Sequence, residues 1–120
     1  MRWSMLTWII RFAAFAIALM VLILSLEPSQ GPGLPYVDKV MHFLAYGLIA
    51  GLIFLGWPSL KLWRVVLIAT IFGICVEMAQ GMTNLGRTPS ILDAVANFAG
   101  ALTSCFILQF LGQIIKNEKK

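Results

Sequence analysis

The sequence is short of charge. It has nine basic and five acidic side chains in 120 residues, while 60% of the residues are hydrophobic. A soluble domain of this size could not hide so much apolar surface, because small domains leave a large share of the chain exposed. The scarcity of charge therefore argues against an ordinary soluble domain and indicates that lipid surrounds the chain.

Several chemical motifs are also missing. Cys75 and Cys105 lie in apolar runs without a CxxC or zinc-type spacing, which is typical of buried small hydrophobes. The chain has no HExxH motif and no serine nucleophile elbow. The basic residues form no patch with interleaved aromatics, so nucleic acid is not an expected partner. The sequence thus predicts no metal site and identifies no cofactor, although a divalent ion held by carboxylates and His42 is conceivable.

What the chain does contain is long apolar runs. Four of them cover residues of about 5–26, 38–57, 62–82 and 90–115. A helix of about 20 residues matches a hydrocarbon core of about 30 Å, and the runs lack the alternation of a membrane barrel strand. We therefore predict an all-α integral membrane bundle of four transmembrane helices, which forms a single domain over residues 1–120.

The first run resembles a signal peptide, because it has a basic start and an apolar middle. No A-x-A cleavage site follows Leu26, and the segment from Glu27 to Gly33 is typical of a turn-rich loop. The sequence therefore favours a retained first helix.

Orientation follows from the basic residues. Seven of them lie at or near one set of helix ends, on the side of the two termini: Arg2, Arg11, Lys61, Arg64, Lys116, Lys119 and Lys120. Only Lys39 and Arg87 lie at the opposite ends. Because lysine and arginine collect on the cytoplasmic side, both termini are predicted to be cytoplasmic.

This topology places the unusual polar side chains at one level, in the outer half of the membrane. They occupy the first turns of the second helix, the last turns of the third, the loop that follows, and the first turns of the fourth: Asp38, Lys39, His42, Tyr46, Glu77, Gln80, Arg87, Asp93 and Asn97. An ionised carboxylate at this depth is costly unless it is paired or faces water. The sequence therefore predicts a polar pocket between the last three helices that opens outward.

The pocket residues fall into two groups of candidates. His42, Glu77 and Asp93 are the candidate catalytic residues, because imidazole and carboxylate groups supply general acid–base catalysis. The others are candidates for binding a substrate, since cations hold phosphate or carboxylate groups and the remaining polar groups orient a headgroup: Asp38, Lys39, Tyr46, Gln80, Arg87 and Asn97.

Each of these residues also has a structural interpretation. Ser90 and Asp93 fit a capping box at a helix start. Glu77 and Arg87 could form an ion pair that fixes the bundle, and Asn97 could join helices by a hydrogen bond. Taken singly none of the residues is decisive, and their common level is what favours a functional pocket.

The motifs resemble those of the VanZ-like membrane proteins. The resemblance rests on D-K-x-x-H-x-x-x-Y from Asp38, E-x-x-Q from Glu77, Arg87, and D-x-x-x-N-x-x-G from Asp93, and it covers about residues 38–104. The first helix contributes nothing to it. This chain has Thr103 and Ser104 where the family pattern suggests another glycine, which affects local packing.

The resemblance implies a multi-pass protein of the bacterial inner membrane that is related to the cell envelope. The family is named for a protein associated with resistance to the glycopeptide teicoplanin. The expected partners are membrane lipids and a lipid-linked envelope precursor. A G-x-x-x-G pattern at Gly47 and Gly51 also permits a homo-oligomer.

Three functions stay open from the sequence. The first is the binding or handling of an amphiphilic envelope molecule, whose headgroup occupies the pocket. The second is an intramembrane acid–base hydrolase or transferase that acts on a lipid-linked substrate. The third is a non-catalytic scaffold or accessory protein, in which the polar residues only specify helix packing. A transporter is the weakest alternative, because four helices without an internal repeat do not suit one.

Overall fold

The structure is a computed structural model, and it describes residues 4–27, 35–83 and 90–120. Within them the chain forms four helices and no strands: α1 (Met5–Ser25), α2 (Pro35–Gly56), α3 (Leu62–Met82) and α4 (Ile91–Glu118). The predicted all-α bundle of four helices is confirmed. All four helices are long and apolar enough to span a membrane, which indicates a multi-pass membrane protein.

Local sequence signals set the helix starts. The side chain of Ser4 accepts a hydrogen bond of 3.2 Å from the backbone N–H of Thr7 and so caps α1. The first residue of α2 is Pro35, three residues before the predicted start, and proline is well suited to the first helical position because it has no N–H to leave unpaired. Ser90 caps α4, accepting at 3.4 Å from the N–H of Asp93.

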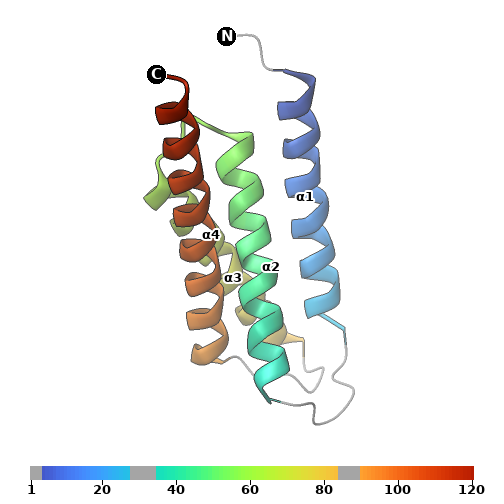
Figure 1. The fold of residues 1–120 in the computed structure, drawn as a ribbon. Coiled ribbons are helices and arrows are strands. Elements are labelled where there is room, and N and C mark those ends of the chain that lie inside the picture. The colour runs from blue at the N-terminus through green and yellow to red at the C-terminus, as the bar shows by residue number, and fades with distance from the viewer. Residues whose placement is uncertain (1–3, 28–34, 84–89) are drawn as a thin grey trace.

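The helices run side by side in an elongated bundle of 54 × 26 × 20 Å (Figure 1). Both chain termini lie at the same end, as four successive spans require. The opposite end is formed by the last turn of α1, the first turn of α2, the last turn of α3 and the first turn of α4. This second end, which we call the polar end, carries the candidate site.

Helices α2 and α4 form the most intimate pair in the bundle. A Cβ atom on Gly100 would clash with the backbone carbonyl of Phe43, and one on Gly47 would lie 3.2 Å from the carbonyl oxygen of Gly100. Small residues also fill the core between α2, α3 and α4, including Ala50, Ala69 and Ala101. These residues permit backbone contact, which is how helices pack when lipid provides no hydrophobic drive between them.

Helix α1 is peripheral, since Ala14 is its only buried residue. The Nε of Arg11 donates a hydrogen bond of 2.8 Å to the carbonyl of Gly56, and its guanidinium lies 5.1 Å from the ring centre of Trp57. Arg11 thereby satisfies a carbonyl at the end of α2 and fastens α1 to it.

Large apolar side chains cover the outside of the bundle. Phe12, Phe15 and Phe110 each have well over half of their surface exposed. In water such a surface would drive aggregation, whereas lipid chains solvate it. The exposed surface therefore agrees with the hydropathy of the helices.

The contact at Gly100 leads to a first prediction. Gly100→Ala should destabilise the fold by about 2 kcal/mol or more, because the new methyl group forces α2 and α4 apart. Gly112→Ala is the matched control, since nothing lies within 4 Å of a Cβ at that position. Thermal unfolding in nanodiscs would measure both changes. Equal stability of the two variants would contradict the proposed close packing.

Candidate functional site

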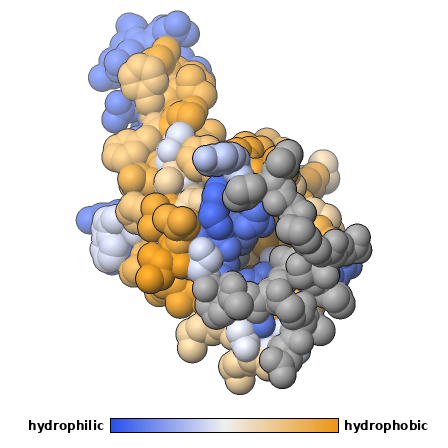
Figure 2. Space-filling view, turned by 90° about the horizontal axis from the view of Figure 1, so that it is seen from below, coloured by the Kyte–Doolittle hydropathy of each residue, from blue (hydrophilic) through white to orange (hydrophobic). Residues whose placement is uncertain are grey.

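The polar residues gather in the middle of the polar end. Figure 2 looks onto this end and shows hydrophilic residues bordered by hydrophobic ones. Among the residues that the structure describes, four polar or charged ones are buried in the bundle: Glu77, Gln80, Asp93 and Asn97. Of the five acidic residues in the chain, three lie here: Asp38, Glu77 and Asp93. The site is therefore rich in carboxylates.

Lys39 of α2 joins two of these carboxylates. Its ammonium group contacts Oδ1 of Asp93 on α4 and lies 3.5 Å from Oδ2 of Asp38. The Asp93 side chain is one-tenth exposed, whereas that of Asp38 is half exposed. Asp93 thus has the cation that a carboxylate needs at membrane depth.

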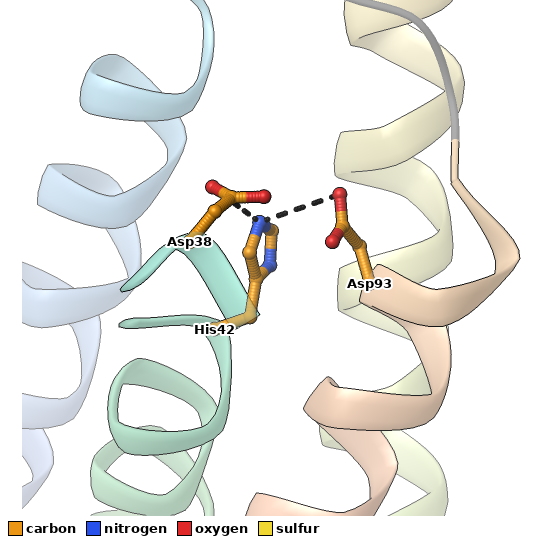
Figure 3. A group of neighbouring side chains, drawn as sticks. All are labelled: Asp38, His42 and Asp93. Atoms are coloured by element: carbon orange, nitrogen blue, oxygen red, sulfur yellow. Dashed lines mark ion pairs between the residues drawn. The ribbon is translucent and has the colours of Figure 1, made fainter. Parts of the chain in front are cut away.

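The imidazole of His42 lies between the same two carboxylates (Figure 3). Its Nε2 is 3.7 Å from Oδ1 of Asp38 and 3.7 Å from Oδ2 of Asp93. Its Nδ1 donates a hydrogen bond of 2.9 Å to Oδ1 of Asn97. Each aspartate therefore directs one oxygen toward Lys39 and the other toward His42.

Tyr46 lies one turn below His42 and is only 1% exposed. The two rings are stacked, with centroids 6.4 Å apart and planes 11° apart. Gly73 of α3 leaves the room for this arrangement, since a Cβ there would lie 2.8 Å from Nδ2 of Asn97 and 3.0 Å from Cε1 of Tyr46. Of the stripe on α2, His42 and Tyr46 thus face the interior of the bundle, while Asp38 is half exposed.

Glu77 of α3 is buried beside the start of α4. Its Oε2 accepts a hydrogen bond of 3.1 Å from the backbone N–H of Ser90. The second half of the expected capping box is therefore supplied by Glu77, and the carboxylate of Asp93 is left for Lys39 and His42. Oε1 of Glu77 and Nδ2 of Asn97 are buried without a hydrogen-bond partner in the described part of the chain.

A groove of about 220 Å³ runs between α3 and α4 next to Glu77. Besides Glu77 and Ser90, its lining is apolar: Ile74, Met78, Ile91 and Ala94. Glu77 thus lines an apolar groove and also lies near enough to Asp93 and His42 to interact electrostatically with them.

Two candidates lie apart from the aspartate–histidine cluster. Nε2 of Gln80 donates a hydrogen bond of 2.7 Å to the carbonyl of Ser25, so Gln80 ties α3 to the end of α1. Arg87 lies outside the described residues, and so does its predicted pairing with Glu77. Of the other candidates, the charged residues of α2 and Asp93 of α4 lie at the polar end, and Tyr46, Glu77 and Asn97 lie deeper in the bundle.

Sequence reasoning missed three participants. Neither Gly73 nor Ser25 is among the candidate residues, and Ser90 enters only as part of a capping box. The N–H of Ser90 and the carbonyl of Ser25 are backbone groups, so no pattern of side chains in the sequence predicts their hydrogen bonds. For Gly73 the available signal was its position one turn before Glu77, which places it beside the polar level.

A protein-family model described as VanZ/LLP1 matches residues 2–112, and the chain belongs to this family. The match includes α1, although none of the motifs that resemble this family lies in α1. No curated protein and no solved structure gives a significant match to the chain.

The pairing of Lys39 with Asp93 leads to a second prediction. Lys39→Met should destabilise the protein by about 2 kcal/mol, between the values for surface and buried ion pairs, because Asp93 then keeps its charge without its cation. Lys39→Met/Asp93→Asn should regain most of this stability. Thermal unfolding in nanodiscs would measure the cycle, with Lys61→Met at an exposed lysine as the control. An equal loss in the single and double variants would contradict the pairing.

Proposed function

We propose that this member of the VanZ/LLP1 family binds the headgroup of a cell-envelope lipid, or of a lipid-linked envelope molecule, at its polar end. The observation that carries the proposal is Glu77. One of its carboxylate oxygens is buried without a partner among the described residues, at the point where the polar cluster meets an apolar groove.

A purely structural cluster would satisfy its buried groups. An unpaired polar atom away from water costs about 1–3 kcal/mol, and a charged one costs more. Hydroxyl or amine donors of a headgroup would pair Oε1 of Glu77, and a headgroup oxygen would accept from Nδ2 of Asn97. These buried groups therefore favour a protein that binds a polar ligand over one that is only a scaffold.

The groove beside Glu77 supports an amphiphilic ligand. Its apolar lining from α3 and α4 would cover part of a hydrocarbon chain while the headgroup reaches the carboxylate. A water-soluble ligand would make no use of this lining. The proposed ligand class is therefore a lipid or a lipid-linked molecule.

We further propose that the polar end faces the outside of the bacterial inner membrane, because most of the basic residues lie at the opposite end. An outward site can reach envelope molecules in the outer leaflet. The link to teicoplanin resistance that the family resemblance implies belongs to the same proposal, since a protein that handles such molecules can alter the envelope that the antibiotic meets.

The geometry of His42 supports a second candidate function, an intramembrane hydrolase or transferase. Two carboxylates flank one nitrogen of the imidazole, and Asn97 orients the other. This arrangement can move a proton to or from a lipid-linked substrate.

A third prediction tests ligand binding. Glu77→Gln keeps the size of the side chain and an oxygen for the N–H of Ser90, but it replaces the unpartnered oxygen by an amide NH₂ group. We expect native mass spectrometry of the gently purified protein to find a specific lipid on the wild type. The variant should hold about tenfold less of this lipid, because it loses one charge-assisted hydrogen bond.

Glu118→Gln is the matched control, because Glu118 is exposed at the other end of α4. The proposal fails if the wild type holds no specific lipid, or if folded Glu77→Gln holds as much as the wild type. A bound lipid whose mass the wild type changes and the Glu77→Gln variant does not would favour the enzyme.

A fourth prediction tests the orientation. In a background with both cysteines replaced, single cysteines at Glu27 and Thr83 should react with an impermeant maleimide added to intact cells. Both positions are exposed at the polar end. A cysteine at Ser59, in the loop between α2 and α3, should react only after lysis. The reverse pattern would place the site in the cytoplasm.

A further inference from the structure

We propose that Asp38, His42 and Asp93 form a binding site for a divalent transition-metal ion. Each residue offers one ligand atom, and these atoms all lie within 4.8 Å of one another. The two distances from Nε2 of His42 to the aspartate oxygens are both 3.7 Å. Ligand atoms about 2.0–2.2 Å from a tetrahedral ion lie about 3.3–3.6 Å apart. The two pairs with His42 therefore need only a small contraction, while the two aspartate oxygens would need to approach one another by up to about 1 Å.

The orientation of His42 supports the proposal independently of these distances. With Nδ1 donating to Asn97, a neutral imidazole directs the lone pair of Nε2 toward two negatively charged oxygens (Figure 3). These groups repel one another unless a proton or a metal ion lies between them. Metal-binding histidines characteristically donate their second N–H to a fixed acceptor, and Asn97 supplies that acceptor here.

Lys39 leaves the metal-facing oxygens unobstructed. It contacts Oδ1 of Asp93 and Oδ2 of Asp38, whereas Oδ2 of Asp93 and Oδ1 of Asp38 face His42. The ammonium group can therefore hold both carboxylates in place while their other oxygens bind an ion. In this arrangement Lys39 is a positioning residue.

The negative charges around the cluster and the unpartnered oxygen of Glu77 point to a ligand with two positive charges. Glu77 is 6% exposed, has one oxygen without a partner among the described residues, and interacts electrostatically with Asp93, His42 and Asp38. When ionised, these three carboxylates exceed the single ammonium by two charges, which one proton on His42 would not balance.

The donor set indicates the class of ion. An imidazole nitrogen favours Zn²⁺ or Mn²⁺ over Mg²⁺ and Ca²⁺, which prefer oxygen ligands alone. Three protein ligands leave at least one coordination position open, as in catalytic zinc sites. A phosphate oxygen of a lipid headgroup could occupy it, and only this last step rests on the proposed function.

A fifth prediction tests the site by metal binding. Tag-free protein in nanodiscs, stripped with a chelator, should bind one Zn²⁺ or Mn²⁺ per chain in isothermal titration calorimetry. Asp38→Asn should weaken binding at least about tenfold, and so should Asn97→Ala through the lost orientation of His42. The Asp38 side chain is half exposed, so its variant should remain folded.

The matched control is Glu118→Gln, a carboxylate lost at an exposed position far from the cluster, which should bind like the wild type. The proposal is overturned if the wild type binds no ion, or if folded Asp38→Asn and His42→Gln bind as tightly as the wild type. Native mass spectrometry of the stripped protein separates the two proposals. If the protein retains lipid but binds no metal, only the proposed metal site is contradicted. If it binds metal but retains no lipid, only the proposed function is contradicted.

Discussion

The close approach of α2 and α4 is the constraint on which the rest of the polar end depends. Because Gly100 has no side chain, the backbone of α4 contacts the carbonyl of Phe43 directly. That contact fixes the register of the two helices and sets Lys39 and His42 opposite Asp93 and Asn97. A wider spacing would leave the carboxylates at membrane depth without their cation, at a cost the bundle could not easily offset.

Hydropathy was sufficient to predict the four helices, because a span of lipid demands a length and a composition that few other structures share. The level of the polar residues also followed from the topology, and the structure places Asp38, His42 and Asp93 together there. The register between helices could not be predicted in this way. Three details depend on how the helices pack together, which no single helix encodes. They are the choice of aspartate oxygen that faces His42, the hydrogen bond from Ser90 to Glu77, and the hydrogen bond from Gln80 to α1.

The chemistry of the site follows from the contrast between its paired polar groups and the acceptor atoms that have no donor beside them. Lys39 satisfies one oxygen of each aspartate, and Asn97 satisfies one nitrogen of His42. Within residues 4–27, 35–83 and 90–120, what remains is a set of acceptors directed at one another, together with one oxygen of Glu77. Folding alone gives no reason to keep such a set, whereas a ligand that supplies positive charge or hydrogen-bond donors does.

Helix α1 is held at its two ends, by Arg11 on the carbonyl of Gly56 and by Gln80 on the carbonyl of Ser25. Between these points Ala14 is its only buried residue. On the α1 side, the contact with Gln80 uses a backbone carbonyl that any residue supplies, whereas the contact with Gly56 needs the side chain of Arg11. The attachment of α1 therefore depends on Arg11 and on the length and hydropathy of the helix more than on the identity of its other side chains.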